Sequence, residues 1–362
     1  VLALNHIGDW GTAFGMLIAY LIHIQHPLIK DKDTKITLDD LIVYYKNAKQ
    51  LFDANALFKA EARQAVTALQ QGKALHRQLW HRICEISRID YQAIYELLRI
   101  EDLQERGESF YQNLCPEMLH DFEHKGLVKT SQGAPCVFLP GFSQKDGTPL
   151  PLLLTKSDGG YNYTSTDLAA LKHRSEIEQA SKILYVTDLG QKLHFEMIFA
   201  AAHKVGYLNQ KTTAEHIGFG LVLGEDGKKL KTRSGTTIPL MDLLNGAIDK
   251  AKQAVLTRHP NINTVLLEKQ ARAIGINAVK YADLSCPRQH DYAFSYARML
   301  NFDGNTALYL MYAYVRIMSL KTKAPHAWQA IDSIDQLSLS HPCEIELAIH
   351  LIRFPEAIDA FQ

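Results

Sequence analysis

The stretch ILYVTDLGQKLHFEMIFAAAHKV, residues 183–205, decides the fold class of this chain. It opens with a continuous apolar run, residues 183–187, which is typical of a parallel strand buried on both faces. The pattern over 195–205 predicts a helix, and residues 216–223 predict another strand. Strands that alternate with helices indicate an α/β core. We therefore expect ligands to bind beyond the carboxyl ends of these strands.

The N-terminal region also has the pattern of an α/β unit. Residues 1–4 are apolar and predict the end of a buried strand. Three glycines follow, at positions 8, 11 and 15, and the helical run 14–24 comes next. A strand, a glycine-rich turn and a helix make one α/β unit.

A long helical region follows between about residues 37 and 124. Thr37 is placed to cap the first helix, and Gly72 stands where a helix should end. Apolar residues recur on one face of the next segment and predict a core-facing stripe. The stripe consists of Leu75, Leu79, Ile83 and Ile86.

From residue 126 onward the sequence pattern changes from helical to strand-like. Two short apolar runs, 137–139 and 150–155, are separated by Asp146–Gly147 and predict a hairpin. After Thr237 the pattern is helical, and it stays so to the end of the chain. The predicted helices cover 239–256, 266–285, 304–320 and 342–360.

Composition narrows the class of protein. The formal net charge of the 362 residues is zero, which argues against a general polyanion binder but leaves room for a local basic face. Five cysteines, none at zinc-ligand spacing, indicate reduced thiols in the cytosol. No apolar stretch is long enough to cross a bilayer. The chain starts at Val1 without a methionine and stops in a helical pattern, so we expect both ends to be cut from something longer.

A basic loop lies in HIGFGLVLGEDGKKLKTRSG, residues 216–235. It carries Lys228, Lys229, Lys231 and Arg233 within six residues, flanked by glycines. A cationic loop that leaves a strand suits polyphosphate binding and stabilises charge on a leaving group. A solvated lysine-rich turn explains the same pattern.

Tyr163 and Asp167 are four residues apart at the start of a predicted helix. A hydroxyl side chain within 164–166 should cap this helix, which would place Asp167 near its first turn and favour the ionised carboxylate. An ionised aspartate beside a phenol suits a guanidinium, which donates two hydrogen bonds. The alternative is that Asp167 only caps the N-terminus of the helix.

Two further groups of residues are candidates. Gln191 and His194 follow the strand 183–187 and could share a face at a helix start, where they would reach a small polar ligand or a phosphate. Tyr309, Tyr312 and Arg316 share a face of the helix 305–323 and suit RNA backbone contacts. The alternative for His194 is a histidine with only a structural role. The alternative for the helix 305–323 is an amphipathic helix that packs on the core.

Several long blocks, spread in order over nearly the whole chain, make it resemble the arginyl-tRNA synthetases, a family of class I aminoacyl-tRNA synthetases. They are LNHIGDWGTAFGMLIAYL (4–21), RGESFY (106–111), GYNYTSTDLAALKHR (160–174), residues 183–207, residues 216–235, GINAVKYADLS (275–285) and DYAFSYARMLNFDGNTALYLMYAYVRIMSL (291–320).

The resemblance implies ligation of L-arginine to tRNA(Arg) through arginyl-adenylate, with ATP and Mg²⁺ as a substrate complex and no structural metal. By the family pattern, Tyr163, Asp167 and Gln191 would bind arginine. His194, His216 and Gly218 would lie at the ATP, and Lys229, Lys231 and Arg233 would act on the pyrophosphate. Tyr309, Tyr312 and Arg316 would contact tRNA. We expect a cytoplasmic monomer with no membrane contact.

The basic loop departs from the class I pattern Lys-Met-Ser-Lys, because Lys229-Leu230-Lys231-Thr232 has threonine in place of the second lysine. His6-Ile7-Gly8-Asp9 resembles the ATP-gripping His-x-Gly-His signature but aligns to a different block, so it is a decoy. We expect that signature to lie upstream of Val1, and we expect the segment alone to be inactive.

The implied fold is a Rossmann-type α/β catalytic core with a helical and hairpin insertion, followed by an all-α domain that is truncated. We predict a core over 1–36 and 157–240, the insertion over 37–156, a helical stem-contact region over 241–290 and the start of an anticodon-binding domain over 291–362. A non-catalytic RNA-binding module derived from a synthetase is the alternative function. A generic nucleotidyltransferase would share the loop but gives no reason for the Tyr163–Asp167 pair.

Overall fold

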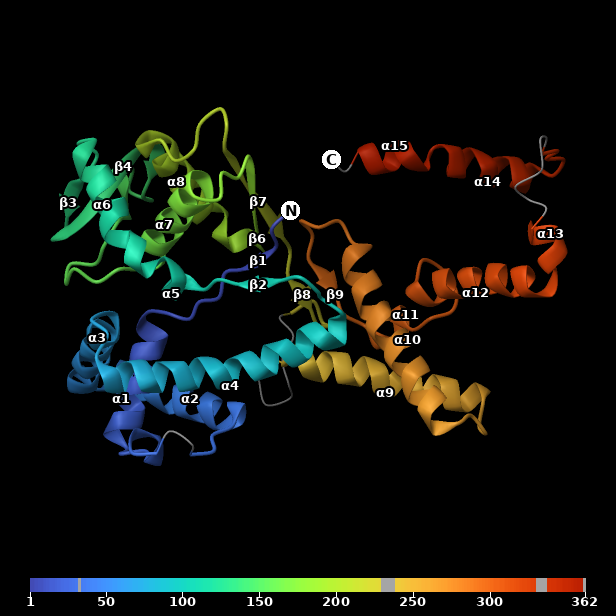
Figure 1. Cartoon of the computed structure of the whole chain (residues 1–362), viewed down its shortest axis with the longest axis horizontal. Coiled ribbons are helices and arrows are strands. Elements are labelled where there is room, and N and C mark those ends of the chain that lie inside the picture. The colour runs from blue at the N-terminus through green and yellow to red at the C-terminus, as the bar shows by residue number, and fades with distance from the viewer. Residues whose placement is uncertain (32–33, 229–237, 330–336, 361–362) are drawn as a thin grey trace. The chain divides into compact units, whose positions relative to one another are not determined.

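The computed structural model describes residues 1–31, 34–228, 238–329 and 337–360. The chain divides into two compact units, Val1–Tyr296 and Ala297–Gln362, and each is described by itself (Figure 1). No helix within the described residues combines the length and the apolar character that a membrane span needs.

The first half of the larger unit is mainly helical. Its elements are β1 (Leu4–Asn5), α1 (Thr12–His23), η1 (Pro27–Ile29), α2 (Leu38–Ala54), α3 (Ala56–Gln70), α4 (Ala74–Leu98), β2 (Gln104–Glu105), α5 (Glu108–Tyr111), η2 (Gln112–Leu114) and α6 (Cys115–His124). β2 pairs with β1 in parallel, so the helical pattern expected between about residues 37 and 124 is broken by this short strand. Arg99, in the left-handed conformation at φ 53°, ends α4 just before it.

The second half alternates strands and helices. Its elements are β3 (Lys129–Ser131), β4 (Ala134–Ser143), β5 (Pro149–Leu153), α7 (Tyr163–Glu176), β6 (Lys182–Asp188), η3 (Leu189–Gln191), α8 (Lys192–Val205), β7 (Thr213–Phe219), β8 (Val222–Leu223), α9 (Leu240–Arg258), α10 (Thr264–Leu284), β9 (Tyr292–Ala293) and α11 (Tyr296–Met299). The antiparallel β4–β5 pair confirms the predicted hairpin, and β6 pairs in parallel with β7, as the α/β pattern predicts.

Helices α1–α4 share one apolar core. Leu79, Ile83 and Ile86 are buried in it and Leu75 packs against it, so the predicted stripe is confirmed. Thr37 forms the predicted cap, a capping box with Asp40. Helices α1 and α3 cross so closely that a Cβ on Gly15 would lie 2.5 Å from the Ala62 carbonyl oxygen.

A second core joins α6, α7 and α8 to the strands. Ile183 and Tyr185 of β6 face this core, and the Tyr185 ring packs on Phe195 of α8. Leu184 and Val186 point the other way and remain 53% and 62% exposed, so the expected burial of this strand on both faces is wrong. Successive strand residues alternate between faces, and α8 packs on one face only.

The predicted strand over 216–223 is divided at Gly220. β7 ends at Phe219, and β8 then pairs with β9 instead of β6. A Cβ on Gly220 would lie 2.7 Å from the Asp291 backbone nitrogen, so a glycine lets the two segments meet.

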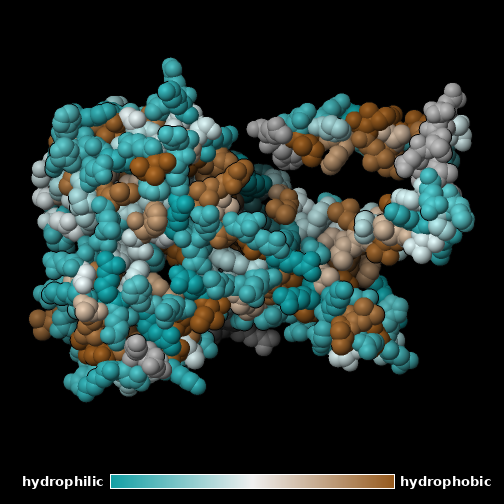
Figure 2. Space-filling view, viewed as in Figure 1, coloured by the Kyte–Doolittle hydropathy of each residue, from teal (hydrophilic) through white to brown (hydrophobic). Residues whose placement is uncertain are grey.

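The second unit contains four helices in its described part beyond the end of α11, and these follow the helical pattern that the sequence predicts after residue 304. They are α12 (Ala307–Lys323), α13 (Pro325–Gln329), α14 (Pro342–Ile352) and α15 (Phe354–Asp359). Many of their apolar side chains are exposed, which Figure 2 shows as brown atoms at the surface.

Candidate active site

Helix α7 begins two to four residues earlier than the hydroxyl cluster predicts. Its N-cap is Asn162, whose side chain accepts a hydrogen bond from the Ser165 backbone nitrogen at 3.1 Å, while Ser165 Oγ accepts from the Asn162 backbone nitrogen at 3.0 Å. The predicted cap within 164–166 is therefore wrong, because asparagine caps at least as well as serine or threonine. Asp167 is the fifth residue of the helix and lies beyond its first turn, not within it as predicted.

Asp167 is hydrogen-bonded to His194, and a second histidine, His6, lies near its other oxygen. His194 Nε2 lies 2.7 Å from Asp167 Oδ2, and His6 Nε2 lies 3.5 Å from Oδ1. The Asp167 side chain is 13% exposed. The Tyr163 and His194 rings are 4.9 Å apart, so the structure brings together Tyr163, Asp167 and His194 as a group.

In the sequence, His6 belongs to a stretch that only resembles the ATP-binding signature. In the structure, it lies between Tyr111, Arg174 and Asp167. Its ring stacks on Tyr111 at 5.4 Å. Arg174 Nη2 donates to His6 Nδ1 at 3.1 Å, so Nε2 carries the ring proton and points at Asp167. Burial, with a smaller effect of Arg174, lowers the pKa of His6 below its ordinary value despite the nearby Asp167. The neutral ring therefore carries its N–H on Nε2, which lies near the carboxylate but forms no hydrogen bond with it.

Glu108 is a site residue that sequence reasoning missed. It begins α5, directly after β2, and burial raises its pKa to about 7, with further contributions from the Asp167 and Asp9 carboxylates. We call Asp9, Glu108 and Asp167 the carboxylate cluster. The position of Glu108 in the chain could have identified it, since Glu108 and Asp9 each follow a parallel strand at its carboxyl end.

Asp9 fixes the segment that carries Glu108. Its carboxylate accepts from the Ser109 backbone nitrogen at 2.9 Å and from Ser109 Oγ at 2.5 Å. A Cβ on Gly107 would lie 2.6 Å from Asp9 Oδ2, so this glycine allows the carboxylate to approach the backbone. The arrangement joins the turn after β1 to the turn after β2.

Gln191 is not brought to the carboxylate cluster. It is exposed at the end of η3, and its amide donates to Asp188 Oδ2 at 2.9 Å. Asp188 Oδ1 in turn accepts from the Gly190 backbone nitrogen at 2.9 Å. Asp188 therefore ties Gln191 to the loop between β6 and α8.

His216 and Gly218 lie on the neighbouring strand β7. His216 Nε2 is 2.8 Å from Thr187 Oγ1, and its ring stacks on Phe195 at 5.1 Å. Phe195 also contacts the His194 ring at 5.1 Å, so a continuous row of rings runs from His216 to Tyr163. The Gly218 carbonyl accepts from Arg288 Nη1 at 2.5 Å.

The remaining candidates are the cations of the basic loop and three residues of α12. Lys229, Lys231 and Arg233 lie outside the described residues. The turn before them is described, and there the Lys228 backbone nitrogen donates to Asp226 Oδ1 at 3.0 Å. On α12 of the second unit, Tyr309 and Tyr312 are 51% and 53% exposed, and the Arg316 guanidinium lies 5.8 Å from the Tyr312 ring centre.

The geometry suits a cationic ligand. Within the described residues the ion-pair partners of Asp167 are histidines, and its charge contributes to the raised pKa of Glu108. The exposed Tyr163 ring lies against His194, the nearer of these histidines. An ionised carboxylate has about four acceptor positions, so Asp167 keeps free positions after its two histidine contacts. A guanidinium group would fill them and relieve the repulsion between the carboxylates.

Comparisons with known proteins agree with one another. The family model for tRNA synthetases class I (R), catalytic domain, matches residues 1–296. An arginine–tRNA ligase from Protochlamydia amoebophila is 48% identical over 360 residues, which are 99% of this chain and 61% of that relative. One from Thermosynechococcus vestitus is 48% identical over 99% of this chain and 62% of its own length.

Solved structures give the same result. The arginyl-tRNA synthetase from Plasmodium falciparum superposes with a TM-score of 0.80 at 32% identity, over 98% of this chain and 57% of that one. The Thermus thermophilus arginyl-tRNA synthetase, at 20% identity, shares the fold with a TM-score of 0.72 over 99% of this chain and 63% of that one. The chain thus spans about three fifths of the length of its relatives.

Proposed function

Because the chain belongs to the family of class I tRNA synthetases (R), we propose that it carries the arginine site of an arginine–tRNA ligase. The proposed reaction is ATP-dependent ligation of L-arginine to tRNA(Arg) through arginyl-adenylate. The observation that supports it most is the contact of Asp167 with His194 beside the Tyr163 ring, with the Glu108 carboxyl near enough for the Asp167 charge to raise its pKa.

Asp167 and Glu108 hold the guanidinium group of the substrate in this proposal. The planar guanidinium donates to both carboxylates at once, while a lysine ammonium is a point charge that leaves acceptors unpaired. A site with buried acceptors rejects a ligand that fails to pair them. Tyr163 covers the arginine side chain, and Gln191 reaches it from the start of α8 once its amide leaves Asp188.

Activation of arginine needs positioning more than acid–base chemistry. A carboxylate oxygen of arginine forms a bond to the α-phosphorus of ATP, and the bond from that phosphorus to the bridging oxygen breaks, so that pyrophosphate leaves with its Mg²⁺. His194, His216 and Gly218 flank the nucleotide, which the row of rings from His216 to Tyr163 supports. Lys229, Lys231 and Arg233 stabilise the charge on pyrophosphate in this scheme.

Transfer of arginine to tRNA completes the proposed reaction. The terminal adenosine of the tRNA attacks the arginyl carbonyl, and AMP leaves. Tyr309, Tyr312 and Arg316 of α12 are the residues proposed to contact the tRNA, and the exposure of the two tyrosines supports this role. We propose that the protein acts as a cytoplasmic monomer.

Stable adenylate analogues test this function directly. The non-hydrolysable sulfamoyl analogue of arginyl-adenylate should raise the melting temperature of the chain, and its lysyl counterpart should not, because binding to the folded state stabilises it. Equal protection by both analogues would contradict the proposed specificity. Binding of tRNA(Arg) with no protection by either analogue would support the non-catalytic RNA-binding module instead.

A further inference from the structure

A buried arginine in the last turn of α7 forms no ion pair within the described part of the chain. Arg174 is 7% exposed, and its Nη2 donates to His6 Nδ1 at 3.1 Å and to the Tyr111 hydroxyl at 3.3 Å. Its guanidinium also lies over the Tyr111 and Tyr185 rings, 5.4 and 5.2 Å from their centres. None of these partners is a carboxylate. Burial of an unpaired charge is costly, and the negative end of the α7 dipole offsets only part of that cost.

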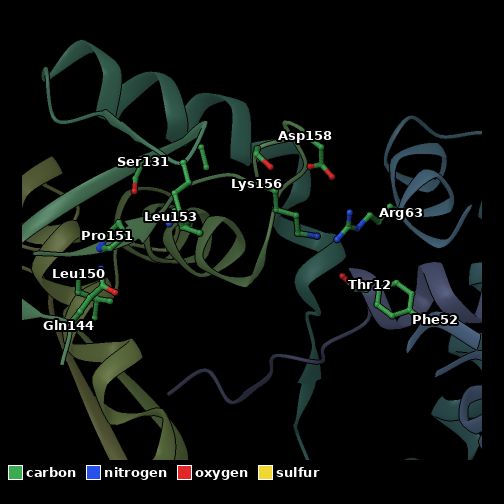
Figure 3. A pocket seen from close by; sticks show the side chains of 13 residues that line it. Thr12, Phe52, Arg63, Ser131, Gln144, Leu150, Pro151, Leu153, Lys156 and Asp158 are labelled. Carbon is green, nitrogen blue, oxygen red and sulfur yellow. The ribbon is translucent and has the colours of Figure 1, made fainter. Parts of the chain in front are cut away.

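Other cations near the turn after β1 face open space. Thr12, which follows this turn, lines a cavity of about 650 Å³ between the β3–β5 sheet and helices α2 and α3 (Figure 3). Arg63 and Lys156 also line it, and their charged ends point toward each other (Figure 3). Neither His6 nor Arg174 is among the residues that line this cavity. The Arg174 charge therefore acts inside the protein, on His6.

The His6 ring lies between the Arg174 guanidinium and the Asp167 carboxylate. Its Nδ1 accepts from Arg174, while its Nε2 is 3.5 Å from Asp167 Oδ1. Stacking on Tyr111, with 20° between the ring planes, fixes the orientation of the imidazole. A protonated imidazole carries a hydrogen on both nitrogens and cannot accept from a guanidinium. The contact with Arg174 therefore requires a neutral His6 ring with its proton on Nε2.

The charge of His6 decides how much of the Asp167 charge is left for a ligand. A protonated His6 would place a cation 3.5 Å from Asp167 Oδ1, the oxygen that His194 does not contact. A substrate guanidinium would then meet a carboxylate that is already paired, with a like charge beside it. A neutral His6 leaves the carboxylate charge available.

Four charged or titratable groups face His6 from the elements packed around it. Asp167 and Arg174 belong to α7, Asp9 to the turn after β1, and Tyr111 to α5. Burial lowers the pKa of His6, Asp167 opposes this effect, Arg174 adds to it, and Asp9 opposes it. Loss of Arg174 would leave two carboxylates acting against burial and would free Nδ1 to take up a proton.

We propose that Arg174 is a positioning residue for arginine recognition, which holds His6 neutral with its proton on Nε2 so that Asp167 keeps its charge for the substrate guanidinium. This inference deepens the proposed function and rests on it, because arginine is the ligand to which Asp167 is assigned. Arg174 does not touch the substrate in this scheme and acts through His6.

Calorimetric titration with L-arginine at about pH 8 and at about pH 6 tests the proposal. Arg174→Met should weaken binding about tenfold relative to the unchanged chain at the lower pH and about twofold or less at the higher pH. The reason is that His6 becomes protonated in most molecules at the lower pH and in few at the higher. Comparison at each pH removes the effect of Glu108, which both chains share. Arg174→Lys keeps a charged donor and should bind arginine as the unchanged chain does.

A second substitution separates an effect through His6 from a structural one. Asparagine cannot take up a proton, so adding His6→Asn to Arg174→Met should remove the extra weakening at the lower pH. Arg272→Met is the matched control, because Arg272 is exposed on α10, and it should leave affinity unchanged. An equal loss at both pH values in Arg174→Met, or a loss at the lower pH that persists in the double variant, would overturn the proposal.

Nitrogen-15 NMR of the histidine rings tests the same relationship without arginine. In the unchanged chain the His6 ring should stay neutral, with its proton on Nε2, from about pH 8 down to about pH 5.5, and loss of its signals in His6→Asn assigns them. A His6 ring that titrates at the ordinary histidine pKa of about 6.5 would overturn the proposal even if Arg174→Met fails to fold. A neutral His6 ring, with no arginine binding by the unchanged chain, would contradict the proposed function instead.

Discussion

His194 Nε2 lies 2.7 Å from Asp167 Oδ2, which joins the first turn of α8 to the second turn of α7. On its other oxygen the same carboxylate faces His6 Nε2 at 3.5 Å. A carboxylate only accepts hydrogen bonds, so the His194 ring donates its Nε2–H to Asp167, while His6 Nε2 lies close without a hydrogen bond. Asp167 is thus oriented before any ligand arrives, and such preorganisation lowers the entropic cost of binding.

His194→Ala should weaken arginine binding about 3- to 10-fold, the range expected for loss of one hydrogen bond that orients the carboxylate. Isothermal titration calorimetry measures the change. His194→Gln keeps an N–H donor and should recover part of the affinity, which a purely structural role would not predict. His203→Ala, on the same helix, is the matched control and should leave affinity unchanged. Unaltered affinity in His194→Ala would remove this residue from the site.

Arginine affinity should rise with pH because of Glu108, whose pKa is about 7 in the chain without ligand. A cationic ligand favours the ionised carboxylate, so binding lowers this pKa and releases a proton. Below pH 7 the affinity should therefore fall by up to about tenfold per pH unit, and above pH 7 it should level off. Calorimetry in buffers of different ionisation enthalpy counts the protons released. Glu108→Gln should abolish the dependence, and a flat profile in the unchanged chain would refute this role.

Gly107→Ala should impair arginine binding more than it impairs folding. The new Cβ would lie 2.6 Å from Asp9 Oδ2, so the carboxylate must move and the Asp9–Ser109 contacts must loosen. Because Glu108 lies between Gly107 and Ser109, its side chain then loses its fixed position. Arginine titration combined with thermal melting separates the two effects. A large drop in melting temperature with arginine affinity preserved would argue that Gly107 serves folding alone.

Gly15→Ala should destabilise the fold by about 1–3 kcal/mol, the usual cost of adding atoms to a packed interface. The added methyl group would meet the Val66 side chain and the Ala62 carbonyl oxygen where α1 crosses α3. Urea unfolding measures the change. Gly8→Ala is the control, since no atom lies within 4 Å of its added Cβ and its φ is not in the left-handed region. Equal stability of the two variants would contradict the close crossing.

Local signals in the sequence predict much of this architecture. The cap at Thr37, the stripe ending at Ile86 and the β4–β5 hairpin depend on contacts between near neighbours, and all three are confirmed. The resemblance to the family is confirmed as well, and the structure groups Tyr163, Asp167 and His194.

Features that depend on distant contacts could not be predicted in the same way. Glu108 and Asp9 follow β2 and β1, which pair in parallel although they are a hundred residues apart in sequence, and the Asp9–Ser109 contacts join the two turns. His6 matches part of the His-x-Gly-His signature, and this local match gave no indication of its contact with Asp167. Two-sided burial of β6 was inferred from its apolar composition, which does not say whether a neighbour covers each face.

Calorimetric titration with L-arginine and with citrulline, its uncharged counterpart of nearly the same shape, tests the central claim most directly. The carboxylate cluster should bind arginine saturably and citrulline not measurably. Asp167→Asn should weaken arginine binding about 30-fold or more, as expected when one member of a buried charged pair is removed. Equal binding of arginine and citrulline, or wild-type arginine affinity in Asp167→Asn, would contradict the claim that these carboxylates hold the guanidinium.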